Sequence, residues 1–267
     1  MGFIMRRFQC VLLAVVAAIG YASIASAADM PTKATMLAPA PVYNWSGFYI
    51  GGFAGLATAG DATTSDPCLV GSPCPGGVGT YNGVPPLGYS LKTGFLGGGT
   101  IGWNWQSPGS RFVFGLENEI GYVHVKGSAV MNAPPIGNGD TTATTTFGNW
   151  YDAYTVRAGY AWNQVLLYAK GGGVSAAVST GVVDATPPVT IDTAPNKVRT
   201  GWAAGVGLEY AMTRNWSLKA EYLYLGLGGT VNNCAQVGGF PPGTIDCTSS
   251  TIKGINTFKV GANYHFN

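Results

Sequence analysis

The stretch VRTGWAAGVGLEYAMTRNWSLKAEYLYLGLG, residues 198–228, decides the fold of this chain. In its first half, up to Tyr210, mostly apolar or aromatic residues alternate with glycine, alanine and charged residues. The second half, from Trp216, repeats this alternation. Because successive side chains leave opposite faces of a strand, a period of two predicts β-strands. The short connection 211–215 joins the two strands into an antiparallel hairpin.

Such a hairpin fits a soluble barrel with its apolar face inward, or a membrane barrel with that face toward lipid. Three features favour the membrane barrel. Charged residues make up only 10% of the chain, against ~25% in a soluble domain. Tryptophan and tyrosine lie at the ends of the apolar faces, where membrane interfaces favour them. The connections elsewhere alternate between long and short, as they do in outer-membrane barrels.

The N-terminal part of the chain has the features of a secreted precursor. Residues 1–27 contain two arginines, Arg6 and Arg7, followed by an apolar run, and end in the small-x-small sequence ASA. This pattern predicts a signal peptide, because the apolar run is too short to span the ~30 Å hydrocarbon core comfortably. Residues 28–43 are rich in alanine and proline without any period, which predicts a flexible periplasmic segment. Residues 44–267 are the predicted barrel domain.

Eight strands are expected in the barrel domain. Their predicted ranges are 44–57, 91–105, 111–125, 149–162, 165–178, 198–210, 216–228 and 253–266. Long loops are expected at 58–90, 126–147, 179–197 and 229–252, all at one end. The even number of strands brings both termini to the short-turn end, which is periplasmic in this architecture. The sequence therefore predicts an all-β, eight-stranded antiparallel up-and-down transmembrane β-barrel with four long outer loops, closed because open sheet edges cannot lie in hydrocarbon.

Several of these segments resemble a known family. They are NWSGFYIGGFAG, YTVRAGYAW, LLYAKGGGV, the hairpin quoted above and the closing FKVGANYHF. They resemble the small outer-membrane β-barrels of the opacity/OmpA-like group, and especially its alphaproteobacterial major surface antigens. The resemblance covers nearly all of the mature chain except the loops. It implies surface exposure in a Gram-negative outer membrane, a part in envelope integrity and, in some relatives, hemin binding or weak pore activity.

The resemblance also bears on biogenesis. Members of this family usually end on an aromatic residue, which the barrel-assembly machinery reads. In this chain Phe266 is followed by Asn267, so the aromatic residue is the penultimate one. Because the chain resembles this family, we expect the barrel-assembly machinery to be its partner during insertion.

Most charged residues of the predicted strands share the inward face. An eight-stranded lumen is just wide enough to be filled by side chains, so charges there must pair. We predict a lumen charge network formed by Glu117, Glu119, Arg157, Lys170, Arg199, Glu209, Lys219, Glu221 and Lys259. Their mutual neutralisation and the lack of a nucleophile–base motif argue against an enzyme. The inward glycines Gly201, Gly205 and Gly207 leave open a water-filled path, as in a small porin or diffusion channel.

Each end of the predicted barrel has its own set of residues. Four lysines lie where a strand meets a long loop: Lys92, Lys126, Lys197 and Lys253. They are the predicted lipopolysaccharide rim, since a lysine stem packs on the apolar belt while its ammonium reaches lipid phosphates. Interfacial lysines without lipid preference are the alternative. A periplasmic aromatic girdle is predicted at the other end, formed by Trp45, Trp103, Trp105, Trp162, Tyr210, Trp216 and Tyr264.

Four cysteines remain after removal of the signal peptide, which contains Cys10. The oxidising periplasm and the close spacing within two loops favour disulfides over a metal site. Cys68–Cys74 and Cys234–Cys247 are the most economical pairs, although the sequence does not settle the connectivity.

The chain offers little for cofactors or nucleic acid. Its two histidines, His124 and His265, are expected at opposite ends of the barrel and cannot bind one metal or heme together. His124 with Tyr81 or Tyr89 is the best candidate for a surface hemin site. No basic, aromatic-interleaved surface suits nucleic acid. The sequence thus predicts a non-enzymatic integral outer-membrane protein for envelope integrity and surface loop display, with a small porin or a binder of hemin or a host ligand as alternatives.

Overall fold

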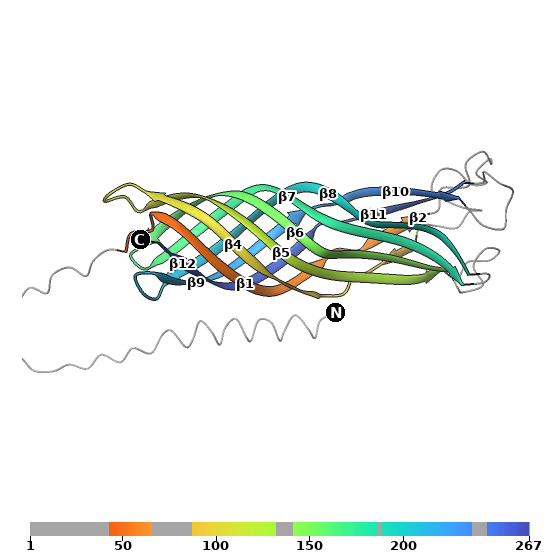
Figure 1. The fold of residues 1–267 in the computed structure, drawn as a ribbon, viewed down its shortest axis with the longest axis horizontal. Coiled ribbons are helices and arrows are strands. Elements are labelled where there is room, and N and C mark those ends of the chain that lie inside the picture. The colour runs from red at the N-terminus through yellow and green to blue at the C-terminus, as the bar shows by residue number, and fades with distance from the viewer. Residues whose placement is uncertain (1–42, 66–86, 132–140, 186–187, 237–244, 267) are drawn as a thin grey trace, which may run out of the picture. The chain divides into compact units, whose positions relative to one another are not determined.

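A computed structural model describes residues 43–65, 87–131, 141–185, 188–236 and 245–266. The predicted signal peptide and most of the N-terminal segment lie outside these residues. Eight strands form a closed barrel, in which neighbouring strands follow the order β1, β12, β9, β8, β7, β6, β5 and β4 (Figure 1). Their bounds are Gly47–Ala59 (β1), Gly94–Gln106 (β4), Phe112–Met131 (β5), Thr141–Trp162 (β6), Val165–Ala185 (β7), Pro188–Ala211 (β8), Trp216–Gly226 (β9) and Ile255–His265 (β12).

The strand register confirms the predicted eight-stranded antiparallel barrel. Register partners followed from Tyr49 through all eight strands return to β1 at Ala59, ten residues further along. A stagger of this size on eight strands corresponds to a tilt of roughly 40°. Such a barrel is narrow enough for side chains to fill its interior. No helix among the described residues is long and apolar enough to cross a membrane.

The wall of the barrel is apolar on the outside and mixed on the inside. Large apolar side chains such as Phe48, Ile101, Leu116, Val206 and Val260 are exposed on its outer face. The residues between them point inward and are buried. This distribution reverses that of a soluble barrel and matches the lipid-facing band of an outer-membrane barrel.

The expected bounds of the four long loops are wrong, because much of their length is strand. β5 and β6 continue to Met131 and start at Thr141, and only residues 186–187 separate β7 from β8. The other two connections contain β2 (Ala62–Ser65), β3 (Leu87–Tyr89), β10 (Gly229–Gln236) and β11 (Ile245–Ile252). The inward positions of these segments hold small residues, threonine and apolar residues in turn. The two-residue period of a strand is therefore faint in the sequence, although threonine itself favours strands.

The four short strands form a second sheet in the order β10, β11, β2 and β3. Its edges contact the extended barrel strands, β10 against β8 and β3 against β5. Inside the extension, hydroxyl groups form a chain in which Thr64 contacts Ser250 and Tyr89 at 3.1 Å each, and Tyr89 contacts Thr145 at 2.6 Å. The outer part is therefore a packed β-structure and not a set of independent loops.

Candidate functional site

Eight of the nine residues predicted for the lumen charge network are buried inside the barrel. Four are carboxylates and four are cations: Glu117, Glu119, Glu209, Glu221, Arg157, Lys170, Lys219 and Lys259. They come from β5, β6, β7, β8, β9 and β12. With every group ionised, the formal charges of this set cancel.

Arg199 does not belong to this cluster. Its guanidinium donates a hydrogen bond to the backbone carbonyl of Thr230, 3.2 Å away in the outer extension. Among the described residues it forms no ion pair with the lumen carboxylates. Its inward parity is as predicted, but its register partner on β7 is Ala176, six residues beyond Lys170 and toward the outer end. Inclusion of Arg199 in the network is therefore wrong.

Lys170 lies at the centre of the network. Its Nζ is 2.7 Å from Glu117 Oε1, 2.8 Å from Glu221 Oε1 and 3.3 Å from Glu119 Oε1. The three carboxylates offer oxygens within 4.8 Å of one another, an arrangement that is also found at metal sites. Here the lysine ammonium lies among these oxygens, so the geometry is that of a buried ion-pair cluster.

The remaining cations extend the cluster across the barrel. Lys259 Nζ lies 2.7 Å from both Glu119 Oε2 and Glu221 Oε1. Lys219 makes longer contacts of 3.4 Å to Glu117 and 3.8 Å to Glu119. These pairs link β12, β9 and β5, which are far apart in sequence. The network therefore ties opposite sides of the wall together.

Two tyrosines hold the arginine of the network. The guanidinium of Arg157 lies 4.7 Å from the ring centre of Tyr49 and 4.9 Å from that of Tyr168. The Tyr49 hydroxyl donates to Glu117 and the Tyr168 hydroxyl to Glu221, each at 2.8 Å. Arg157 itself pairs with Glu209 at 3.2 Å. A weakly hydrated, planar guanidinium suits this stacked environment better than an ammonium.

Neighbouring groups, Tyr168 among them, fill the space next to the inward glycines. A Cβ added at Gly207 would collide with the ring of Tyr168, and one at Gly205 with Leu223 and the backbone of Tyr222. At Gly201 it would meet the backbone of Gly226. These glycines therefore permit close packing of neighbouring groups. Neighbouring groups therefore occupy the space beside these glycines, where the small-porin alternative places a water-filled path.

Sequence reasoning missed a polar group next to Glu209. Ser217 Oγ donates to Glu209 Oε1 at 2.5 Å, and His265 Nε2 is 3.0 Å from Ser217 Oγ and 3.2 Å from Glu209 Oε1. Serine, histidine and glutamate are the residue types of a hydrolase triad. In a triad, however, the two imidazole nitrogens serve different partners, whereas here Nε2 faces both groups. All three residues are also fully buried. The inward parity of Ser217 and His265 was the available signal.

Trp45 closes the short-turn end of the lumen and is not a girdle residue, which corrects the prediction. It is fully buried, packs edge-on against His265 and donates from Nε1 to the carbonyl of Asn163 at 3.3 Å. Tyr43 lies on Trp45 with ring centres 4.7 Å apart. Burial, with a smaller effect from Glu209, raises the pKa of Tyr43 to about 12, so its hydroxyl stays neutral at physiological pH. The residues before β1 thus form an aromatic lid.

The other six predicted girdle residues lie on the outer wall near this end. Trp103, Trp105, Trp162, Tyr210 and Trp216 are exposed, and Tyr264 is partly exposed. Tyr264 packs edge-on against Trp216 with ring centres 5.3 Å apart. Each lies within three residues of a strand end next to a short turn or the C-terminus. Their positions suit a membrane interface.

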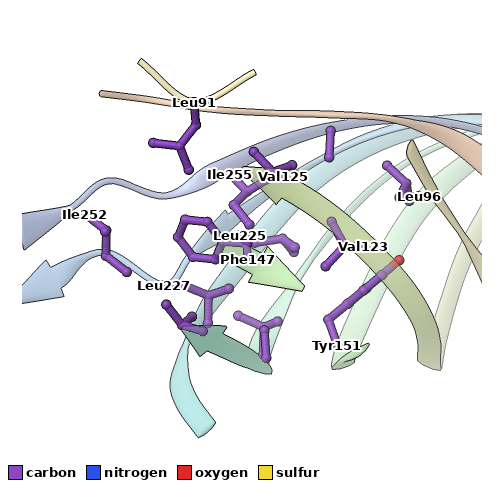
Figure 2. Close-up of a cluster of buried hydrophobic side chains, with 14 of the residues drawn as sticks. Leu91, Leu96, Val123, Val125, Phe147, Tyr151, Leu225, Leu227, Ile252 and Ile255 are labelled. Carbon is purple, nitrogen blue, oxygen red and sulfur yellow. The ribbon is translucent and has the colours of Figure 1, made fainter. Parts of the chain in front are cut away.

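Above the charge network, toward the outer end, the lumen is filled by apolar side chains. Figure 2 shows Val125, Phe147, Leu225 and Ile255 pointing toward one another from four different strands. All four are fully buried. The cluster continues to Leu91 and into the outer extension. A continuous apolar filling of this kind excludes water.

The four predicted rim lysines are exposed, but only two of them lie next to a strand end. Lys92 and Lys253 lie just before β4 and β12, whereas Lys126 and Lys197 lie within β5 and β8. Lys126 alternates with the buried Val125 and Gly127 and so faces outward. Lys197 is the register partner of the buried Val178, so it belongs to the inward-facing row of β8.

The candidate hemin residues are not brought together. His124 lies on the outer wall, where its ring stacks on that of Tyr122 with centres 6.2 Å apart. Tyr89 is buried in the hydroxyl chain described above. Tyr81 lies outside the described residues. His124 and Tyr89 therefore cannot form the expected site.

Of the two predicted disulfides, Cys68–Cys74 lies outside the described residues. Cys234 and Cys247 are direct register partners on β10 and β11. Directly opposed residues of antiparallel strands have Cα atoms about 4.5–5.5 Å apart, which falls within the range that a disulfide spans. We expect non-reducing peptide mapping of the mature protein to yield a Cys234–Cys247 linked peptide. A Cys68–Cys247 link, or a free thiol at Cys234, would contradict this pairing.

The fold and the filled lumen define an integral β-barrel of the outer membrane. The sequence profile of the outer membrane protein beta-barrel domain family matches residues 14–266, and the chain belongs to this family. It is 29% identical to the 31 kDa outer-membrane immunogenic protein of Brucella melitensis over 97% of this chain and 100% of that protein. It is also 29% identical to the 22 kDa outer membrane protein of Rhizobium leguminosarum bv. viciae, over 69% of this chain and 65% of that protein.

Solved structures agree with the fold. OprG from Pseudomonas aeruginosa matches with a TM-score of 0.50 at 10% identity, over 84% of this chain and 98% of that one. The outer membrane protease OmpT from Escherichia coli also matches with a TM-score of 0.50, at 11% identity over 87% and 99% of the two chains. These likenesses concern the fold alone. Together with the family they place the protein in the outer membrane, as the sequence predicts.

Proposed function

We propose that this protein is a closed, non-enzymatic barrel that stabilises the cell envelope and displays its outer β-extension at the cell surface. The observation that carries this proposal is the filled lumen. An aromatic lid at the short-turn end, a charge-balanced network in the inner half and an apolar cluster in the outer half follow one another along the barrel axis. Each would have to be displaced before ions could pass.

The charge network supports closure more strongly than a diffusion channel. A conducting pore needs charges that water and ions can reach, whereas these side chains are at most 1% exposed in their ion pairs. Each carboxylate already pairs with a lysine or with Arg157. Breaking such pairs leaves uncompensated buried charge, which is strongly unfavourable.

Planar-bilayer recording of the refolded protein tests closure. We expect no steady ion conductance above the bare-bilayer level, because the three successive fillings exclude water. Insertion is verified in the same preparation by the different migration of unboiled and boiled protein in SDS gels. A reproducible unitary conductance from correctly inserted barrels would support the small-porin alternative instead.

Surface display rests on the extended hairpins and the second sheet. The predicted outer loops are largely strand, so the displayed surface has a defined shape. The Brucella relatives are named outer-membrane immunogenic proteins, which fits exposure of this end. During insertion, the closing strand β12 and the exposed Phe266 are the segment that we propose the barrel-assembly machinery reads.

A further inference from the structure

We propose that Lys92, Lys126 and Lys253 together bind the phosphate groups of lipopolysaccharide in the outer leaflet. The proposal rests on the membrane orientation of the proposed function, with the short turns in the periplasm. It narrows the predicted rim of four lysines to three neighbouring ones. The argument uses their position around the barrel, their height and the wall beneath them.

The three lysines lie on one side of the wall, over four consecutive strands of the eight. Barrel neighbours follow the order β12, β1, β4 and β5. Lys253 precedes β12, and its side chain lies within 2.9 Å of the position that a Cβ on Gly60, just after β1, would occupy. Lys92 precedes β4, and its backbone N–H donates to the carbonyl of Lys126 on β5 at 2.9 Å. All three side chains are exposed.

They also lie at the height of lipid headgroups. A strand tilted by roughly 40° rises about 2.5 Å per residue. Lys126 is therefore about 5 Å above His124 and about 10 Å above Tyr122 on the same outward face. Lys92 lies at a similar height, because its backbone N–H donates to the carbonyl of Lys126. Tyrosine and tryptophan mark the membrane interface, so Tyr122 places the ammonium groups above it just outside the hydrocarbon.

The charge of this side of the wall suits a phosphorylated lipid. Among the described residues, Asp61 is the carboxylate that lies between Lys253 and Lys92, and it accepts a hydrogen bond from Ser90 at 2.8 Å. The local charge therefore remains positive. Three ammonium groups on neighbouring strands can meet two phosphates of one headgroup, which an isolated interfacial lysine cannot do.

An apolar groove lies below Lys253 on the lipid-facing wall. It has a volume of about 610 Å³ and crosses β1, β12, β9 and β8 as far as Leu167 on β7. It is lined by small residues such as Ala54 and Ala220 and by larger ones such as Leu56, Tyr222 and Phe258. Its apolar lining suits an acyl chain. The rim cations would hold the phosphates of such a lipid, and the groove further down the wall would accept one of its chains.

Lys197 supplies a matched control. It lies on β8, across the barrel from β4, and in the inward-facing row. Arg199, two residues further on, contacts the second sheet. Replacement of Lys197 therefore removes one exposed ammonium at the same end of the barrel without touching the three-lysine cluster.

The test compares the wild type, the triple variant K92Q/K126Q/K253Q and K197Q, each refolded into phosphatidylcholine vesicles. Binding of lipopolysaccharide to the vesicles and its effect on the unfolding temperature are measured. We expect the triple variant to bind about tenfold more weakly, equivalent to about 1.4 kcal/mol over three exposed charge contacts. K197Q should bind like the wild type. The single variant K126Q, measured in the same way, should lose less of its lipopolysaccharide binding. It replaces the triple variant in the test if the triple variant folds poorly.

Two further binding measurements identify the ligand. Dephosphorylated lipopolysaccharide should bind the wild type as weakly as the triple variant binds the intact lipid. Inorganic phosphate should not compete at concentrations that leave the vesicles intact. Equal binding by the wild type and the triple variant, or equal losses in the triple variant and K197Q, would overturn the site and leave lysines without lipid preference. Failure of the wild type to show a heat-dependent gel shift would instead refute the membrane barrel itself.

Discussion

Replacing Lys170 with methionine is expected to destabilise the folded barrel by about 3–5 kcal/mol. The lysine contacts three buried carboxylates within 3.3 Å, and methionine keeps most of its volume without the charge. Four carboxylates would then face three cations in a lumen that excludes water. Urea unfolding in phospholipid vesicles, followed by tryptophan fluorescence and gel migration, measures the loss. Lys126→Met, at an exposed position, should change the unfolding free energy little.

A charge-balanced double variant separates electrostatics from packing. Glu221→Gln removes one of the carboxylates that Lys170 neutralises. The double variant K170M/E221Q should therefore recover part of the stability that K170M loses. Lys219→Ala should cost less than K170M, since its contacts are longer, at 3.4 and 3.8 Å. An unchanged unfolding free energy in both K170M and Lys219→Ala would contradict the network as the element that plugs the lumen.

Replacing Phe147 with alanine should cost about 3–5 kcal/mol, the usual loss for a buried phenylalanine. The sequence pattern places Phe147 at the end of a long loop, where such a change would matter little. In the structure its ring is fully buried among apolar side chains of the lumen (Figure 2). The same urea assay measures the effect.

Val130→Ala provides the control for this substitution. Val130 lies on the same long hairpin, but 48% of it is exposed. Its replacement should leave stability nearly unchanged, because little buried surface is lost. If Phe147→Ala were as mild as Val130→Ala, the outer extension would be a loosely held loop and not a packed continuation of the barrel. Protease digestion of the intact vesicles should show the same contrast.

The number and order of the membrane strands could be read from the sequence, as could the inward charges. Both depend on the two-residue period of a strand, which is a local property of the chain. The parity of Glu209, Lys219 and Glu221 within one hairpin sufficed to place them inside. Their neutralising partners on other strands could also be predicted, because a narrow eight-stranded lumen leaves no room for unpaired charge.

The ends of the strands and the membership of the clusters were decided only by the tertiary structure. Arg199 shares the parity of Glu209 but lies too far toward the outer end to join the network. Trp45 has the composition signal of a girdle residue, yet it turns into the lumen and covers His265. Parity gives the face of a side chain but not its height, because the height depends on the register and stagger of strands far apart in sequence.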